Sequence, residues 1–395
     1  MTSLAITDIG SLVTNDPNLG NKSDEPNFLG LRSDAALVIE DGVVVWVGDN
    51  ASVPDTDEQH SVEGAAVIPG FVDSHSHMVF GGERSAEFAA RMAGQSYAAG
   101  GIRSTVAATR SATDAQLRNN LRALSTEMLT SGITTFETKS GYGLDLATET
   151  RSLRIASSYT EEVTYLGAHV VPAEFQDRPD DYVALVCGEM LNSAVGAGAK
   201  WIDVFCDRGA FDADQARAIL AAGVAANLKP RIHANQLQAG DGIKVAVEFD
   251  CASADHCTHL TEADIELLAG SNTVATLLPG AEFSTRSPYP DGGRLVDAGV
   301  TVALATDCNP GSSFTTSMPF CIAVAVRDMN LTPDQALWAA TAGGAKALRR
   351  TDVGHLGLGA AADFLVLGAP NHIFLAYRPG VDLIDQVWKA GEPQF

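Results

Sequence analysis

Short apolar runs alternate with longer amphipathic segments through the middle of the chain. Eight runs have the length and the β-branched or aromatic content of buried strands, and most are separated by segments with helical spacing. They lie at residues 67–73, 132–139, 163–171, 201–206, 230–235, 251–257, 273–279 and 300–307. Eight such units over roughly 285 residues match a (β/α)8 barrel of the TIM type, which typically takes about 250 residues. A doubly wound open sheet is the alternative, but no GxGxxG motif follows the first run.

Three of the intervening segments begin with a helix-capping signal. Thr113, Asp212 and Thr332 each stand three residues before a glutamine, which is the spacing of a capping box. In the first of these helices an apolar stripe recurs at spacings of four, three and four residues, at Leu117, Leu121, Leu124 and Met128. Gly132 is the expected stop after this helix.

Both ends of the chain are predicted to form short strands. The N-terminal candidates are SLAITDIGSLV and AALVIEDGVVVWVGD, with Asp41-Gly42 as a hairpin turn. The C-terminal candidates are ADFLVLGAP, HIFLAYRPG and LIDQVWKAGEP. Neither end alone can bury a β face, so we expect the two to combine into a small β-sandwich. The predicted domains are this sandwich, from residues 1–66 and 355–395, and the barrel, residues 67–354.

Polar residues stand where the predicted barrel strands end. His75 and His77 follow the first run, one residue apart, and would face the same side of an extended segment. The later strand ends carry Glu137, Lys139, His169, His233, His256 and Asp307. Each alone has an ordinary explanation, such as a hydrogen-bonded core histidine or a turn aspartate. In a barrel, however, these ends converge on one mouth, so five of the nine histidines are predicted to share a pocket.

Three imidazoles and one carboxylate at such a mouth suit zinc or a similar first-row ion and leave positions for water and substrate. A bound zinc ion lowers the pKa of water to about 7. The remaining histidine, His256, would accept the proton of the water and pass it to a leaving group. The residues therefore predict metal-assisted hydrolysis.

Composition limits the classes of ligand and the cellular compartment that we expect. The formal net charge is −23, with 46% hydrophobic and 19% charged residues, which is typical of a compact protein that does not bind nucleic acid or an anionic membrane. An anionic substrate would then need a local cation. The six cysteines form no CxxC pair, no signal peptide or membrane span is apparent, and a cytoplasmic location is expected.

The xPGFVDxHxH strand end, the histidines of the fifth and sixth strands and the ATDxN segment resemble the amidohydrolase superfamily. Within it, KSGYGLD and the DxNxGS segment in TDCNPGSS are more specific and resemble the imidazolonepropionase family over most of the chain. This resemblance implies hydrolytic ring opening of 4-imidazolone-5-propanoate to N-formimidoyl-L-glutamate in histidine degradation. It also implies a homodimer.

The resemblance further implies a role for individual residues. One divalent or trivalent ion, zinc or iron, would be held by His75, His77, His233 and Asp307. The substrate would be bound by Arg84 at its propionate carboxylate, and otherwise by Tyr142, His169, Gln236, Asn309, Gly311 and Ser312. Catalysis falls to His256 and Asp307, either of which could be the base that accepts the proton of the water.

Two departures from the family pattern and three alternatives accompany this interpretation. The segment at residues 94–105 looks shorter than the corresponding family loop, so closure over the site could differ. Gln236 stands where glutamate also occurs in the family.

A cytosine- or guanine-type deaminase would carry a glutamate shortly after His233, and a dinuclear dihydroorotase would need a lysine at the end of the fourth strand; neither is present. A non-catalytic metal-binding scaffold is the alternative from a different class.

Overall fold

The computed structural model describes residues 3–21, 27–94 and 101–394. Half of the loop predicted to be short, residues 95–100, lies outside this description. The chain divides into two compact units. One comprises Met1–Asp73, Glu127–Thr135 and Ser317–Phe395, and the other comprises Ser74–Thr126 and Phe136–Thr316. The domain boundaries at residues 66 and 354 stay a prediction, because a compact unit need not be an independently folding domain.

The strands expected in the middle of the chain form a parallel sheet in the order β14-β13-β12-β11-β9-β8-β7-β6. Their bounds are β6 (Phe71–Asp73), β7 (Ile133–Lys139), β8 (Glu162–Ala168), β9 (Trp201–Cys206), β11 (Ile232–Ala234), β12 (Ser253–His256), β13 (Val274–Leu277) and β14 (Val302–Leu304), with β10 (Lys229–Pro230) beside β9. This order confirms the eight-stranded barrel. Its strands are almost entirely buried, as expected for a parallel sheet covered by helices.

The barrel closes at its mouth through the segment that follows β6. The N–H of Asp307 donates to the carbonyl of His75 at 3.0 Å, and the N–H of His77 donates to the carbonyl of Cys308 at 2.9 Å. On the other side of the same segment, the N–H of Lys139 donates to the carbonyl of Ser76 at 3.0 Å. The His-Ser-His segment is therefore held between β7 and the chain that leaves β14.

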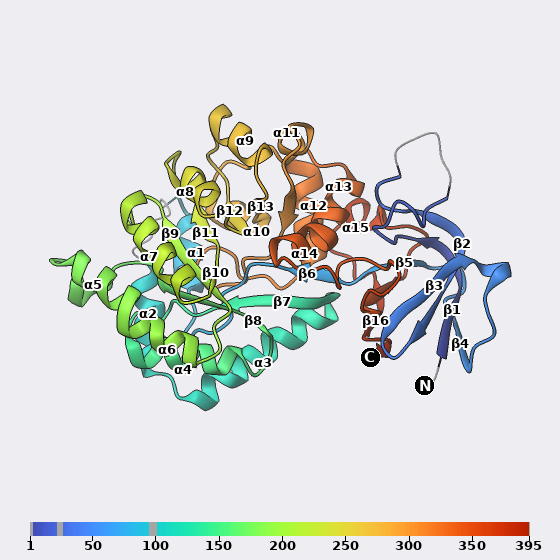
Figure 1. The fold of residues 1–395 in the computed structure, drawn as a ribbon, viewed down its shortest axis with the longest axis horizontal. Coiled ribbons are helices and arrows are strands. Elements are labelled where there is room, and N and C mark those ends of the chain that lie inside the picture. Colours follow the sequence, from blue (N-terminus) through green and yellow to red (C-terminus); the bar gives the residue numbers. More distant parts are fainter. Residues whose placement is uncertain (1–2, 22–26, 95–100, 395) are drawn as a thin grey trace. The chain divides into compact units, whose positions relative to one another are not determined.

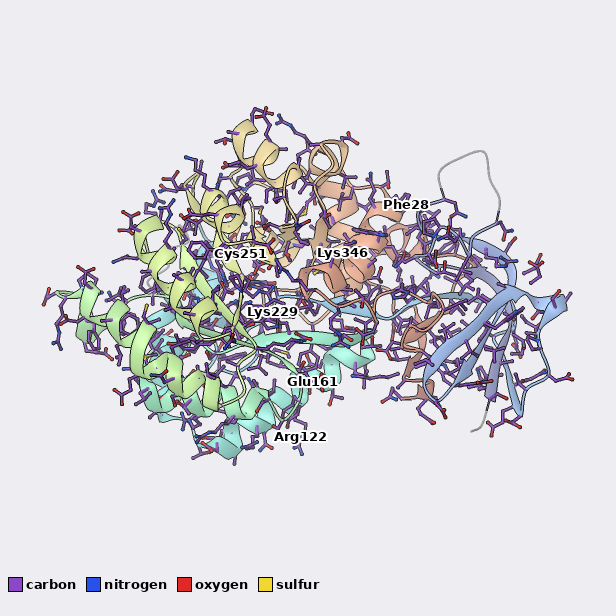
Figure 2. The ribbon with its side chains drawn as sticks, in the orientation of Figure 1. Phe28, Arg122, Glu161, Lys229, Cys251 and Lys346 are labelled. Carbon is purple, nitrogen blue, oxygen red and sulfur yellow. The ribbon has the colours of Figure 1, made fainter. Side chains whose placement is uncertain are left out.

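Helices surround the strands of the parallel barrel (Figure 1). They are α1 (Ser85–Met92), α2 (Ile102–Ser111), α3 (Asp114–Thr130), α4 (Leu146–Ala156), α5 (Pro179–Leu185), α6 (Leu191–Gly196), α7 (Ala213–Ala225), α8 (Gly242–Glu248), α9 (Glu262–Ala269), α10 (Pro279–Thr285) and α11 (Gly292–Asp297). All four residues of the predicted stripe on α3 are buried. Arg122 of the same helix is exposed and points outward (Figure 2). The capping boxes at Asp212 and Thr332 are confirmed, and Thr113 exchanges hydrogen bonds with Gln116 in the same way.

The strands of the two chain ends share one eight-stranded sheet, which confirms that the ends combine. It contains β1 (Ser3–Leu12), β2 (Arg32–Glu40), β3 (Val43–Asp49), β4 (Glu58–Ser61), β5 (Ala66–Pro69), β15 (Phe364–Leu367), β16 (Ile384–Lys389) and β17 (Glu392–Pro393). Asp41 and Gly42 have φ values of 49° and 78°, as the hairpin turn between β2 and β3 requires. The remaining helices of this unit are α12 (Met318–Asp328), α13 (Pro333–Trp338), α14 (Gly344–Ala347) and α15 (Phe374–Tyr377).

Two expectations about strands need correction. The first apolar run is not one strand, because it breaks at Gly70 into β5 of the chain-end sheet and β6 of the barrel. A Cβ at Gly70 would lie 2.3 Å from the hydroxyl oxygen of Thr134, so only glycine lets the backbone pass there. The segment HIFLAYRPG forms the short helix α15 instead of a strand. The side chain of Asn371 accepts a hydrogen bond from the N–H of Ile373 at 3.1 Å and starts this turn, a local signal that apolar content does not reveal.

No helix in the described ranges combines the length and the hydropathy that crossing a lipid bilayer requires.

Candidate functional site

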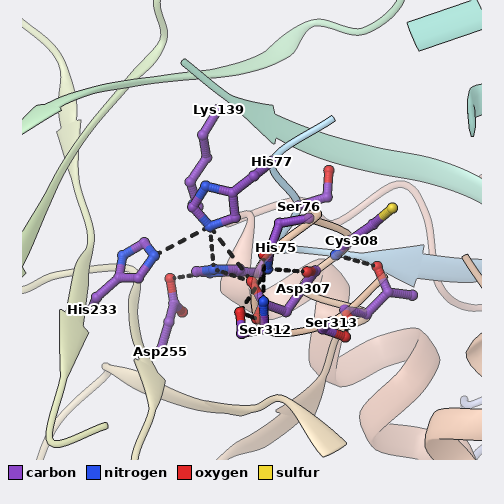
Figure 3. Close-up of polar contacts among 12 residues, drawn as sticks. His75, Ser76, His77, Lys139, His233, Asp255, Asp307, Cys308, Ser312 and Ser313 are labelled. Atoms are coloured by element: carbon purple, nitrogen blue, oxygen red, sulfur yellow. Dashed lines mark hydrogen bonds and ion pairs between the residues drawn. The ribbon is translucent and has the colours of Figure 1, made fainter. Parts of the chain in front are cut away.

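Four donor atoms from three strand ends converge at the mouth of the barrel (Figure 3). The Nε2 atom of His77 lies 3.1 Å from Nε2 of His75 and 3.3 Å from Nε2 of His233. The Oδ1 atom of Asp307 lies 3.5 Å from Nε2 of His75 and 3.6 Å from Nε2 of His77. All four side chains are buried. The geometry therefore brings together the four residues predicted to bind a metal.

The protonation of these groups fits a cation at the point of convergence. Burial, reinforced by Lys139 and by the other histidines, holds the pKa of His75 well below its ordinary value, and burial does the same for His77. On the far side of the rings, Nδ1 of His75 lies 2.7 Å from Oδ2 of Asp255, and Nδ1 of His233 lies 3.1 Å from Oδ1 of Asp203. Each Nδ1–H donates to its carboxylate, so each Nε2 presents a lone pair. Facing lone pairs and a carboxylate oxygen repel one another, and a metal ion relieves this repulsion.

Backbone strain is concentrated around this point. His256, Cys257 and Asp307 have positive φ values of 78°, 54° and 53°. Such conformations are costly for residues other than glycine and are found where surrounding structure holds a functional group in place. The hydroxyl of Ser312 donates to Oδ2 of Asp307 at 2.9 Å and fixes the second oxygen of this carboxylate. Burial raises the pKa of Asp307 well above its ordinary value, against the opposing effect of this hydrogen bond.

A cavity opens beside the four donor atoms. Its lining includes the other predicted site residues Arg84, Tyr142, His169, Gln236, His256, Asn309 and Ser312. The ring centroid of His256 lies 5.5 Å from that of His233, and the ring of His169 stacks on His77 at 5.4 Å. Gly311 does not line the cavity but abuts Arg84, because a Cβ at this position would lie 2.3 Å from Nη1 of the guanidinium.

His169 is held in one tautomer. Burial, reinforced by His233, lowers its pKa to about 3, so the ring is neutral near physiological pH. Its Nδ1–H donates to the carbonyl of Gly141 at 3.0 Å. The other ring nitrogen, Nε2, therefore has a lone pair that can accept an N–H from a bound molecule.

A buried carboxylate holds the backbone of the loop that carries Tyr142. Glu149 of α4 accepts hydrogen bonds from the N–H groups of Gly141, Gly143 and Leu144 at 2.7–3.1 Å. Tyr142 is only 3% exposed. This side chain is therefore part of the cavity wall and not the exposed loop tyrosine that its glycine neighbours would suggest.

The guanidinium of Arg84 is held in a fixed plane. Its Nε and Nη2 atoms donate to the two carboxylate oxygens of Glu87 at 2.9 and 2.6 Å. The adjoining turn is shaped by Asn309, whose Oδ1 accepts from the N–H groups of Gly311 and Ser312 at 2.7 and 2.8 Å. Arg84 is 8% exposed, so it is a buried group at the cavity and not a solvated loop charge.

Sequence reasoning missed several charged residues around the site. Asp203 and Asp255 lie inside apolar strands, Arg231 lies between β10 and β11, and all three are buried. Glu87, Glu149 and Glu282 lie on helices beside the mouth. The first three could have been found from the sequence, because a charged residue within an apolar run needs a buried partner. The three helical glutamates could not, since surface helices carry many such residues.

Glu282 predicts a pH dependence of stability. Its side chain accepts a hydrogen bond from the hydroxyl of Thr258 at 2.6 Å, and burial raises its pKa to about 7. Below about pH 4.5 the carboxyl is protonated in both states, so ionisation opposes folding only above this pH. As the pH rises toward 7, the unfolded chain releases a proton that the folded chain keeps, and the free energy of unfolding falls by about 3 kcal/mol.

We expect Glu282→Gln to abolish this loss, because the amide stays neutral and can still accept from Thr258. In urea unfolding of chelator-treated protein, the stability of the variant relative to wild type should increase by about 3 kcal/mol between pH 5 and pH 8. Comparing the two proteins at each pH cancels the titration of every other group. Parallel stability profiles would show that Glu282 does not titrate in this range.

Comparisons with known proteins agree with the geometry of the site. The model of the amidohydrolase family matches residues 66–393. The chain is 63% identical over 392 residues to the imidazolonepropionase of Mycolicibacterium smegmatis, covering 99% of this chain and 98% of the relative. It is also 63% identical over 396 residues to that of Salinispora arenicola, covering 100% of this chain and 99% of the relative.

Solved structures with lower identity share the fold. An adenosine deaminase from Xanthomonas campestris with bound zinc is 19% identical, with a TM-score of 0.70 and coverage of 99% of this chain and 92% of that chain. The guanine deaminase of E. coli is 17% identical, with a TM-score of 0.68 and coverage of 100% and 99%. The family and the converging donor atoms together support a metal ion at this site.

Proposed function

This chain belongs to the amidohydrolase family and, within it, to the imidazolonepropionases, and we propose that its barrel mouth opens the ring of 4-imidazolone-5-propanoate with water. The product is N-formimidoyl-L-glutamate, and the reaction belongs to histidine degradation. The oxygen of water bonds to the ring carbonyl carbon, the neighbouring C–N bond breaks, and the departing nitrogen takes a proton. The observation that carries the proposal is the convergence of three imidazole nitrogens and one carboxylate oxygen beside a cavity that contains a fixed arginine.

The proposed metal ligands are His75, His77, His233 and Asp307, and the proposed ion is zinc or iron. When bound, such an ion acts as a Lewis acid that makes water a nucleophile near neutral pH. The carboxylate partners at Nδ1 of His75 and His233 support this assignment, because they direct the Nε2 atom of each ring toward the point of convergence.

The substrate is proposed to bind with its carboxylate at Arg84 and its ring against the opposite wall. Arginine offers a planar pair of donors that matches a carboxylate, and Glu87 fixes that plane. The ring would contact Tyr142, His169 and Gln236, with Nε2 of His169 accepting an N–H. The glutamate portion of the product would face Asn309, Gly311 and Ser312.

Two residues are proposed to move protons. Asp307 lies at the point of convergence and accepts the proton of the attacking water. His256, on the cavity wall beside His233, stabilises the developing oxyanion and protonates the departing nitrogen. Gln236 has no ionisable proton, so a glutamate base of the deaminase kind is not available at this position.

The test is a spectrophotometric assay with freshly generated 4-imidazolone-5-propanoate. We expect rapid loss of substrate that stops after chelator treatment and returns when zinc or ferrous iron is added back. Formation of N-formimidoyl-L-glutamate, followed by mass spectrometry, identifies the bond that breaks. A folded, metal-loaded protein that leaves the imidazolone intact but releases ammonia from cytosine or guanine would replace this function with deamination.

We also propose a homodimer in the cytoplasm, with the sandwich and barrel domains bounded at residues 66 and 354. The six cysteine thiols support a reducing compartment. Light scattering of the purified chain tests the dimer.

A further inference from the structure

A layer of buried charges lies beneath the converging histidines and has no place in the proposed reaction. Lys139 of β7 is buried, and its Nζ lies 2.9 Å from Oε1 of Glu137 and 3.0 Å from Oδ2 of Asp203. Arg231, beside β11, is also buried, and its guanidinium lies 3.5 Å from Oδ2 of Asp255 and 3.6 Å from Oε1 of Glu137. Glu137 thus joins the two cations, and each cation reaches one aspartate.

The two aspartates connect this layer to the metal-site histidines. Asp203 accepts from Nδ1 of His233, and Asp255 accepts from Nδ1 of His75. Two parallel chains result, Lys139–Asp203–His233 and Arg231–Asp255–His75, bridged by Glu137 (Figure 3 shows Lys139, both histidines and Asp255). The orientation of each imidazole therefore depends on a carboxylate that is itself held by a buried cation.

Glu137 also holds the backbone between the first two histidines. Its Oε2 accepts from the N–H of Ser76 at 3.0 Å, and its main-chain carbonyl accepts from the hydroxyl of Ser76 at 2.5 Å. Ser76 stands between His75 and His77. The same network thus controls both the side-chain and the backbone position of the histidine pair.

Stability alone does not account for such a layer. Removing charged groups from water costs several kcal/mol each, and apolar side chains of similar volume often serve a core as well. Lys139 lies 3.0 Å from Asp203 and Arg231 lies 3.5 Å from Asp255, so each aspartate that contacts a histidine is also paired with a buried cation. A carboxylate held in this way orients the imidazole with the proton on Nδ1.

The two cations also account for a second group of donor atoms. Asp203, His233 and Asp255 place ligand atoms within 4.8 Å of one another, which is close enough for a cation. Lys139 and Arg231 already pair with these carboxylates. Charge neutralisation there is supplied by the protein, so this second group needs no metal ion of its own.

We propose that Lys139, Glu137 and Arg231 are positioning residues that orient His233 and His75 for metal binding and thereby set the affinity of the site. This inference rests on the proposed metal site but assigns roles to residues that the reaction does not use. Loss of one partner should weaken metal binding about 10–100-fold, as is typical for groups that support metal ligands.

The test measures zinc affinity of the full-length, metal-stripped chain by competition with a chromophoric chelator. Lys139→Met removes one cation at similar side-chain length. The matched control is Lys200→Met, because Nζ of Lys200 also pairs with a buried glutamate, Glu162, at 2.5 Å. Glu162 is the first residue of β8, whereas the last residue of this strand, Ala168, precedes His169 at the mouth. We expect zinc affinity to fall about 10–100-fold for Lys139→Met and to stay at the wild-type value for Lys200→Met.

A second readout separates positioning from loss of stability. In 15N spectra of the histidine rings, the wild-type apoprotein should show His233 protonated at Nδ1, whereas Lys139→Met should show a mixture of tautomers. If Lys139→Met does not fold, Glu137→Gln provides the decision. Glutamine has nearly the same shape, removes the charge and can keep only one of the two acceptor oxygens that face Ser76 N–H and Lys139 Nζ.

The outcomes are distinct for the two proposals. A folded wild-type protein that binds no zinc or iron overturns the proposed metal site itself. A wild-type protein that binds zinc, together with a Lys139 or Glu137 variant of equal affinity and unchanged histidine tautomers, overturns only the positioning layer.

Discussion

His256→Ala lowers kcat for ring opening by about 10²–10⁴-fold while the protein keeps its metal. The expected size is that of a lost general acid–base group. His256 lies on the cavity wall, its ring centroid 5.5 Å from that of His233, and it is not among the four converging donors. Turnover should therefore fall without loss of bound ion, which metal analysis of the purified variant measures.

The matched control is His259→Ala. His259 follows three residues later and does not line the cavity, so its removal should leave kcat close to the wild-type value. His256→Gln adds a second comparison, because glutamine can donate a hydrogen bond to an oxyanion but cannot transfer a proton. If His256→Gln recovers most of the activity, oxyanion stabilisation dominates. If His256→Ala turns over as fast as wild type, the role assigned to His256 is wrong.

The convergence of side chains at the barrel mouth could be predicted because barrel geometry converts strand ends into neighbours. His75, His169, His233 and His256 are up to 181 residues apart in sequence, yet all lie at or near the carboxyl ends of parallel strands that share one mouth. The alternation of side chains along a strand does not explain why His75 and His77 converge. His75 and His77 follow β6 and do not belong to it, and their convergence depends on backbone pairing with residues 307 and 308.

The layer beneath the site could not be predicted in the same way. Glu137 and Lys139 were noticed as strand-end residues, but nothing in their spacing indicates that Lys139 of β7 pairs with Asp203 of β9, on the far side of β8. Such pairings depend on the register of parallel strands, which local sequence does not encode. The break of the first run at Gly70 and the helix α15 were missed for a related reason, because both depend on single local contacts.

Arg84→Gln lowers kcat/KM for 4-imidazolone-5-propanoate by about 10²–10⁴-fold, equivalent to about 3–5 kcal/mol for an unpaired charge in a buried site. The guanidinium is 8% exposed, and the chain around it carries a net charge of −23, so no diffuse positive field replaces it. Glutamine can donate a hydrogen bond to the substrate carboxylate but supplies neither charge nor a paired fork.

The loss of kcat/KM caused by Arg84→Gln should disappear for a ring analogue that lacks the propionate. Wild type should discriminate against this analogue by about the same factor that Arg84→Gln loses on the full substrate, and the variant should treat the two compounds almost alike. Arg84→Lys keeps the charge without the fork that Glu87 holds in plane, so it should lie between the two proteins. A variant that loses activity equally on both compounds would show that Arg84 supports the site as a whole and does not read the carboxylate.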